Sequence, residues 1–115
     1  MKALVVRTDN SMELIEQEWN YEQINKAVGG WIEAINFGKH DDHFAYINEE
    51  GKLLGLPTNE LVTSYWYESG TRVLIGDYIA GDAVVFGEID EEGNNTDVPD
   101  HVVSRFIKYQ DNING

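Results

Sequence analysis

Side chains that can bind or do chemistry gather around one stretch of the sequence, AYINEEGKLLGLPTNELV at residues 45–62. Its amides and carboxylates are groups that hydrogen-bond a ligand. Asn and Gly are also the ordinary residues of tight turns. The stretch therefore indicates either turn chemistry or a binding site. Read as local structure, it predicts a strand, a tight acidic turn, a second short strand and the start of a helix.

Glu33 is the carboxylate that neither turn nor cap chemistry explains. Strand alternation in WIEAINF (31–37) places it on one face with Trp31, Ile35 and Phe37. A carboxylate there can accept hydrogen bonds from a ligand or from buried backbone amides. We expect Trp31 and Ile35 to keep water away from Glu33, which favours the structural role.

Five aromatic residues add a second feature that suggests binding: Trp31, Tyr65, Trp66, Tyr67 and Tyr78. Aromatic residues at helical or strand spacing usually belong to the core. Three of these are consecutive, however, and a helix cannot bury all three on one side. At least one is expected to be exposed or to line a cleft, where it can stack on a ligand or contact a partner. The candidate ligand- or partner-binding residues are Glu33, Asn48, Glu49, Asn59, Trp66 and Arg72.

Familiar catalytic and metal-binding motifs fail on inspection. The acidic turn EIDEEGNNTDVP (88–99) has Pro where a calcium loop needs its twelfth-position Glu. HDDH (40–43) offers two imidazoles but no third His nearby, and a metal ligand also needs supporting groups. GDYIAGDA (76–83) has acid and Ala where a phosphate loop needs Lys and Ser or Thr. With no cysteine in the chain, we expect no catalytic residue, metal or cofactor.

Charge is the strongest global feature, with 21 Asp and Glu against 8 Lys and Arg and a net charge of −13. Such a surface repels nucleic-acid phosphates and attracts basic surfaces. Solubility alone is the alternative explanation. Between Arg72 and Arg105 the chain has no basic residue. The acidic partner surface is predicted from this segment, at Asp77, Asp82, Glu88, Asp90, Glu91 and Glu92.

These residues require a scaffold, and apolar patterning predicts a single α+β domain over residues 1–110, with a frayed tail at 111–115. The sheet is expected to be mostly antiparallel, with two or three short helices. The predicted strands are 2–8, 12–19, 31–37, 43–47 and two more within 70–89. The predicted helices follow Asn20 as far as Gly29 and cover 58–68 and 99–110. Two similar turns, INEEG (47–51) and IDEEG (89–93), are each expected to connect antiparallel strands.

Three phrases together carry a resemblance: VGGWIEAI (28–35), AYINEEGKLLGLPTNEL (45–61) and LIGDYIAGDAVVFG (74–87). Over roughly residues 1–90 the chain resembles the family described as domain of unknown function 3846, common in bacteriophages and bacterial mobile elements. The resemblance implies a small phage-type accessory protein and carries no activity with it. Its recurring positions here are Gly29, Gly30, Glu33, Asn48, Glu49, Gly51, Asn59 and Gly81.

Two functions of different classes follow as expectations. The first is a non-enzymatic acidic protein that binds and inhibits a basic host factor, as a counter-defence protein or nucleic-acid mimic. The alternative is a protein that sequesters a small molecule or nucleotide in a pocket near Glu33 and Trp66. The apolar N-terminal run is too short for a signal peptide or membrane span, so the expected location is the bacterial cytoplasm, with no membrane partner.

Overall fold

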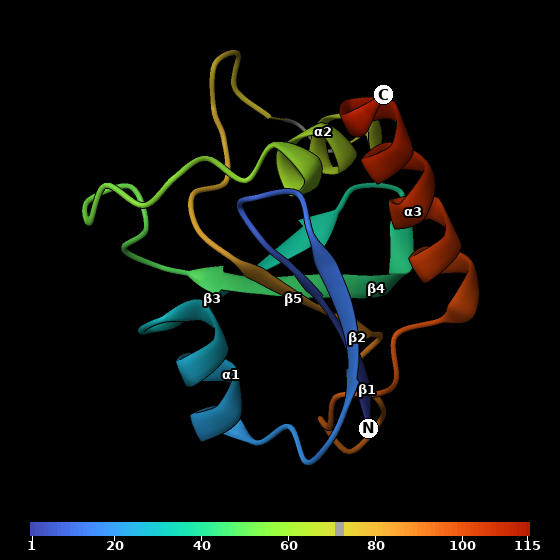
Figure 1. Ribbon diagram of the computed structural model, residues 1–115. Coiled ribbons are helices and arrows are strands. Elements are labelled where there is room, and N and C mark those ends of the chain that lie inside the picture. Colours follow the sequence, from blue (N-terminus) through green and yellow to red (C-terminus); the bar gives the residue numbers. More distant parts are fainter. Residues whose placement is uncertain (71–72) are drawn as a thin grey trace.

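The computed structural model describes residues 1–70 and 73–115 and confirms the α+β class (Figure 1). Its five strands form one antiparallel sheet in the order β2-β1-β5-β4-β3. One helix, α1, covers one face of the sheet, while α2 and α3 cover the other. The elements are β1 (Lys2–Val6), β2 (Met12–Glu16), α1 (Tyr21–Val28), β3 (Ile32–Phe37), β4 (His40–Asn48), α2 (Glu60–Glu68), β5 (Ala83–Gly87) and α3 (Asp100–Asn114).

The sheet has a core on both faces because side chains alternate along each strand. Leu4 pairs with Val85, and Val85 pairs with Ala45 across β1, β5 and β4. These residues face α2 and α3 in the larger core cluster. Their neighbours Val5 and Val84 point the other way, towards α1. The central strand β5 is buried along its whole length, which explains its uninterrupted apolar sequence AVVFG.

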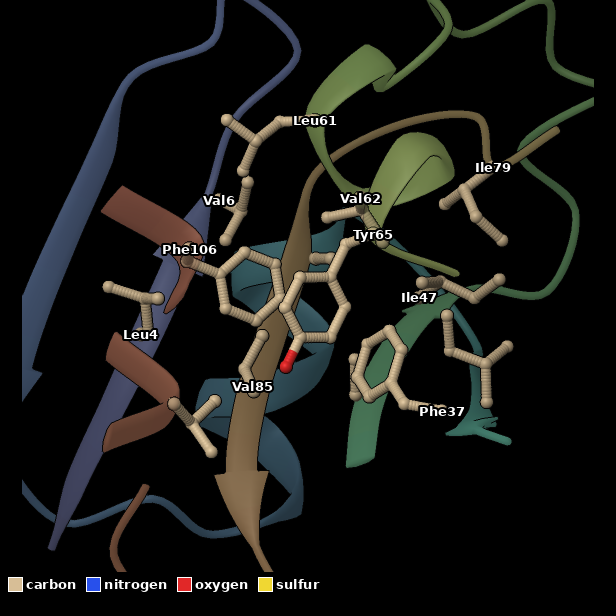
Figure 2. Close-up of a cluster of buried hydrophobic side chains, with 14 of the residues drawn as sticks. Leu4, Val6, Phe37, Ile47, Leu61, Val62, Tyr65, Ile79, Val85 and Phe106 are labelled. Carbon is tan, nitrogen blue, oxygen red and sulfur yellow. The ribbon is translucent and has the colours of Figure 1, made fainter. Parts of the chain in front are cut away.

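Tyr65 of α2 and Phe106 of α3 join the two helices over the sheet. Their rings are stacked with centroids 3.9 Å apart and planes 7° apart, and Figure 2 shows them face to face among the core side chains. Phe37 of β3 meets the Tyr65 ring edge-on. Burial of these large rings supplies much of the hydrophobic stabilisation on this side of the sheet.

The predicted boundaries of α1 are confirmed in detail. Asn20 accepts a hydrogen bond from the Gln23 backbone amide, and the Gln23 side chain accepts one from the Asn20 amide. This reciprocal pair satisfies two amides that the first helical turn leaves without partners. Gly29 ends the helix with a φ of 83°, a conformation that Gly adopts at little cost.

The strand prediction for the segment before α3 is wrong in part. Of the two strands expected within 70–89, the described residues contain only β5; residues 73–79 form a loop, and Ala80 makes an isolated bridge with Thr58. Leu74, an apolar residue of the segment expected to form these strands, is 80% exposed. Tyr67 holds this loop in place, since its hydroxyl lies within hydrogen-bond distance of the carbonyls of both Asp77, at 2.8 Å, and Leu74, at 3.1 Å.

Neither acidic turn connects two strands. After β4 the chain makes successive turns over residues 49–55 and then enters α2, so the second short strand predicted there is absent. After β5, residues 88–99 form a loop that leads into α3. The third helix also continues beyond its expected end at 110, to Asn114, and Ile113 packs on the core. Within the described residues, no helix has the length and apolar character needed to cross a membrane.

Candidate functional site

A cavity of about 280 Å³ lies between α2, the exposed edge strand β3 and two loops. We call it the loop pocket. Its first wall comes from β3 and the end of β4, its second from the turns after β4, its third from Trp66 of α2, and its fourth from residues 77–80. The lining residues with polar or aromatic side chains are Glu33, Asn48, Glu49, Lys52, Trp66, Asp77 and Tyr78.

The pocket brings together four of the six residues predicted to bind a ligand or partner: Glu33, Asn48, Glu49 and Trp66. Asn59 is buried elsewhere in the structure. Arg72 lies outside the described residues. Tyr78, considered in the sequence only as one aromatic among five, also lines the pocket. Nothing in its local pattern distinguishes it from a core residue, because the loop that positions it has no regular period.

Glu33 faces the pocket from the edge of the sheet. Its partner in the register is Ile47, which places it on the α2 side of β3 as strand alternation predicts. The expectation that Trp31 and Ile35 shield it is wrong: Glu33 is exposed and Trp31 is 62% exposed. Trp31 lies before the first residue of β3. Within the described residues the Glu33 carboxylate accepts no hydrogen bond, so it does not anchor buried amides.

Lys52 and Asp77 link the two loops across the mouth of the pocket. The Lys52 ammonium donates to the Asp77 carboxylate, and it also lies 4.7 Å from the centre of the Tyr78 ring. This hydrogen bond raises the pKa of Lys52, with a smaller contribution from the charge of Glu33, and lowers the pKa of Asp77. Both groups are therefore charged at neutral pH. The pair fixes the distance between the loops that frame the pocket.

The aromatic prediction for the run 64–68 is confirmed. Tyr65 is buried, Tyr67 is exposed, and Trp66 is half-buried in the pocket lining. An amphipathic helix that packs its Tyr65 against α3 must direct the next side chain away from that contact, towards the pocket. The pocket thus has one indole and one phenol ring in its walls, and its floor contains the buried Ile35, Ile47 and Ile79.

Asn48 and Gly51 shape the pocket, but not through left-handed turn conformations. The Asn48 side chain donates to the carbonyl of Val28 and accepts from the Glu50 amide, so its polar atoms are engaged. Gly51 is required by close packing, since an added Cβ would lie 2.6 Å from the carbonyl oxygen of Ala80. Both residues hold the acidic turn against neighbouring segments.

Asn59 is a structural residue at the start of α2. Its side chain accepts from the Val62 amide as a helix cap. The same side chain donates to the carbonyls of Val6 and Gly81, each at 3.0 Å. It is fully buried. One side chain therefore joins α2 to β1 and to the segment entering β5.

The six predicted acidic surface residues do not share one place in the fold. Asp77 and Asp82 precede β5, whereas the other four follow it, at the opposite end of the strand. Asp77 is paired with Lys52, and Asp82 accepts a hydrogen bond from the Thr8 amide. Asp90 accepts from the amides of Glu92 and Asn94 within its own loop. The exposed Glu88, Glu91 and Glu92 are the members without such a structural contact among the described residues.

A buried polar network was missed by the sequence reading. His43 is fully enclosed; its Nδ1 lies 2.7 Å from Asp42 and its Nε2 lies 2.8 Å from the Tyr65 hydroxyl. Arg105 of α3 donates to the same hydroxyl, and His101 lies 2.6 Å from the second Asp42 oxygen. Burial lowers the pKa of His43 despite the opposing effect of Asp42. The sequence signal was HDDH, whose first three residues lie before the strand predicted at 43–47 but belong to β4 in the structure.

The proton arrangement in this network follows from the neutral state of His43. A neutral imidazole donates from one nitrogen and accepts at the other, so Nδ1–H donates to Asp42 and Nε2 accepts from Tyr65. Burial raises the pKa of Asp42, but the hydrogen bonds from His43 and His101 outweigh it and leave that pKa lowered. Since these contacts occupy the imidazoles and carboxylate, the cluster ties β4 to α2 and α3. The described residues contain no group of three or more ligands suited to a metal ion.

Comparison with known families identifies a match to this chain. The family model described as domain of unknown function (DUF3846) matches residues 1–112, which is essentially the whole chain. The match extends beyond the part of the sequence that carried the resemblance and includes the acidic loop and α3. No curated protein and no solved structure matches the chain.

Proposed function

The chain belongs to the family described as domain of unknown function (DUF3846), and from that premise we propose that it is a non-enzymatic binding protein that holds a small organic molecule in the loop pocket. In the phage or mobile-element setting that the family resemblance implies, such a protein would act in the bacterial cytoplasm. Its effect would come from sequestering the molecule.

One observation carries the proposal: residues from four separate segments converge on one cavity. Glu33, the turn after β4, Trp66 and Tyr78 are far apart in sequence, yet all line the loop pocket. Ligand sites are mainly apolar cavities with a few polar groups aimed inward. Here isoleucine side chains and two aromatic rings provide the apolar surface, while Glu33 and Glu49 provide carboxylates. The charge of Glu33 also acts on Lys52.

Backbone hydrogen bonds join the segments around the pocket, which favours binding. Residues 57–59 and 79–81 meet beside α2 through the Thr58–Ala80 bridge and through backbone bonds from Asn59 to Ile79 and from Gly81 to Pro57. The outer parts of the two loops diverge (Figure 1). Asn59 adds its buried side-chain bonds where the two segments meet. A pocket preformed in this way loses less entropy when a ligand binds.

Thermal-shift screening tests the proposal directly. The panel contains nucleosides, nucleotides and small amines, and any hit is titrated by the intrinsic tryptophan fluorescence, compared between the wild type and the Trp66 variant. We expect a stabilising ligand whose effect is lost in Trp66→Leu and kept in Trp31→Leu, the matched change of an exposed Trp outside the pocket. A panel without any stabilising member, or a hit that survives Trp66→Leu unchanged, would contradict the proposal.

A second function, binding and inhibition of a basic host factor, is supported by a different observation. The loop after β5 exposes Glu88, Glu91 and Glu92. The loops beside the pocket also expose large aliphatic residues, with Leu53 at 87% in addition to Leu74. The loop that exposes the three glutamates lies at the opposite end of β5 from these aliphatic residues, so the acidic loop itself supports this function, as a contact for a basic surface.

Capture from host lysate at two salt concentrations tests this second function. Contacts that depend on exposed charge weaken with ionic strength. We therefore expect a basic protein to be retained at about 20 mM salt and released at about 300 mM. Retention should fall in the triple variant Glu88→Gln, Glu91→Gln, Glu92→Gln. Recovery of no basic protein at low salt would remove this function.

A further inference from the structure

The loop pocket has an excess of negative charge that its own residues do not neutralise. Its lining contains three carboxylates, Glu33, Glu49 and Asp77, and Lys52 is the basic residue among the described lining residues. Lys52 is hydrogen-bonded to Asp77, so the positive charge of Lys52 and the negative charge of Asp77 offset each other. Glu33 and Glu49 remain as two unbalanced negative charges facing the cavity.

These two carboxylates differ from the acids that support loops elsewhere in the structure. Asp82, Asp90 and Asp97 each accept backbone amide hydrogen bonds and thereby hold a segment in place. The described structure gives Glu33 and Glu49 no comparable contact. Both carboxylates are exposed at the pocket and not enclosed in it, so each is open to a cation that enters.

The pocket already accommodates one ammonium group, that of Lys52. This group lies over the Tyr78 ring and against the Asp77 carboxylate, so an aromatic face and a carboxylate together hold a cation. Trp66 offers a second aromatic surface in the same lining as Glu33 and Glu49. Trp66, Glu33 and Glu49 thus repeat the combination of aromatic ring and carboxylate that holds Lys52. Among the described lining residues, no second basic side chain pairs with them.

We propose that the loop pocket selects an organic cation, a guanidinium or ammonium group carried on a short apolar or aromatic body; this inference rests on the binding function proposed above. The charged group pairs with Glu33 and Glu49, and the body packs on Trp66 and the isoleucine floor. The volume of about 280 Å³ is near the lower end of ligand sites, which favours a small molecule. The same carboxylates repel phosphate, so nucleotides are disfavoured.

Titration of the ¹⁵N-labelled protein followed by NMR tests this selectivity. The probes are agmatine and phenethylamine as cations, 2-phenylethanol as the neutral counterpart of phenethylamine, and AMP as an anion. We expect both cations to shift the amide signals of residues 33–35, 48–53 and 77–80. Their affinity should fall at least about tenfold in Glu33→Gln, since one lost charge contact at such a site is worth about 1.4 kcal/mol or more.

The matched control is Glu16→Gln, which removes an exposed carboxylate from β2 at the opposite edge of the sheet. It should leave cation affinity unchanged. Binding of AMP or 2-phenylethanol in the pocket without binding of the cations would overturn the inference and leave the binding function intact. If no probe shifts the pocket signals, both proposals fail. Equal weakening by Glu16→Gln, or equal shifts in residues 88–97, would reveal general attraction to an acidic surface and also overturn the inference.

Discussion

At the scale of single residues, most positions in the family phrases serve to hold the chain together. Gly30 packs against the Asn48 side chain, and Gly51 packs against the carbonyl of Ala80. Asn59 bonds to the carbonyl of Gly81. These contacts join the phrases to one another, so their spacing in the sequence is explained by packing. Glu33 and Glu49 are the polar members that such packing leaves unexplained.

Asn59→Ala should destabilise the domain strongly. The change removes a helix cap and leaves the buried carbonyls of Val6 and Gly81 without their donor. We expect a loss on the order of 3 kcal/mol in the free energy of unfolding. Asn20→Ala, at the exposed cap of α1, is the matched control and should cost about 1 kcal/mol. Urea unfolding measures both, and equal costs would show that the buried bonds add nothing.

Glu33→Gln should leave stability almost unchanged, within about 0.5 kcal/mol, because the carboxylate is exposed and accepts no hydrogen bond from the described chain. The structure thus gives no support to the amide-anchoring role that the sequence favoured for this residue. Urea unfolding midpoints of wild type and variant provide the measurement. A loss of more than about 1 kcal/mol would restore the role of amide anchor that the sequence had suggested.

His43 should make the domain acid-sensitive. Burial lowers the pKa of His43 in the folded protein below its ordinary value of 6.5, so the unfolded chain binds the proton first as pH falls. Stability therefore declines as pH drops below about 6.5, by at most about 1.4 kcal/mol per pH unit for this group. His40, whose pKa burial also lowers, adds a change of the same sign.

Urea midpoints measured between pH 7.5 and 5.5 test this dependence. His43→Gln is expected to be less stable at neutral pH, because it disturbs the bonds to Asp42 and Tyr65, but to show a weaker decline on acidification. Asp42, with its lowered pKa, contributes a further loss only at lower pH, as the pH falls through its folded-state pKa. A wild-type midpoint that stays constant over this range would contradict the assignment of a neutral buried imidazole.

At the scale of secondary-structure elements, the docking of α3 depends on a few large side chains. Phe106 stacks on Tyr65 and is fully buried, whereas its neighbour Ile107 is exposed. Arg105 and His101 add polar contacts to Tyr65 and Asp42. The helix is amphipathic, with an apolar stripe that matches the groove between α2 and the sheet.

Phe106→Ala should cost about 3–5 kcal/mol, the usual range for removing a large buried ring. Ile107→Ala on the same helix should cost less than about 0.5 kcal/mol, since that side chain faces solvent. Thermal unfolding followed by circular dichroism compares the two variants. A cost for Ile107→Ala close to that for Phe106→Ala would show that the helix is seated differently on the sheet.

Helices and strands with a regular apolar repeat or a recognisable cap could be predicted from the sequence, whereas the loops around the pocket could not. The α1 cap follows from Asn20, Gln23 and Gly29 alone, because cap chemistry is local. The 73–80 loop has strand-like composition, but its conformation is set by distant contacts from Tyr67 and Lys52. Four pocket residues were identified by type, whereas the convergence of their segments depends on the strand order.

At the scale of the whole molecule, the net charge of −13 acts against the compact state. Folding gathers 21 carboxylates and only 8 basic side chains on a chain whose radius of gyration is 13.1 Å. Like charges at this density repel one another, and the unfolded chain relieves the repulsion by expansion. Ion pairs such as Arg7–Glu13 are exposed and contribute little to offset it.

Added salt should therefore stabilise this protein. Screening over about 10 Å at 0.1 M ionic strength shortens the reach of the repulsion. We expect a gain on the order of 1 kcal/mol in the free energy of unfolding between about 20 and 200 mM NaCl, or about 4 °C in Tm for a domain of this size.

The triple variant Glu88→Gln, Glu91→Gln, Glu92→Gln is the control, with a net charge of −10, three units less negative than the −13 of the wild type. It should start from a higher Tm at low salt and gain less when salt is added. Differential scanning calorimetry of both proteins decides the matter. A wild-type Tm that falls with salt would mean that attractive pairs outweigh the repulsion, and the charge would then have to be explained by the arrangement of acids and bases in the fold.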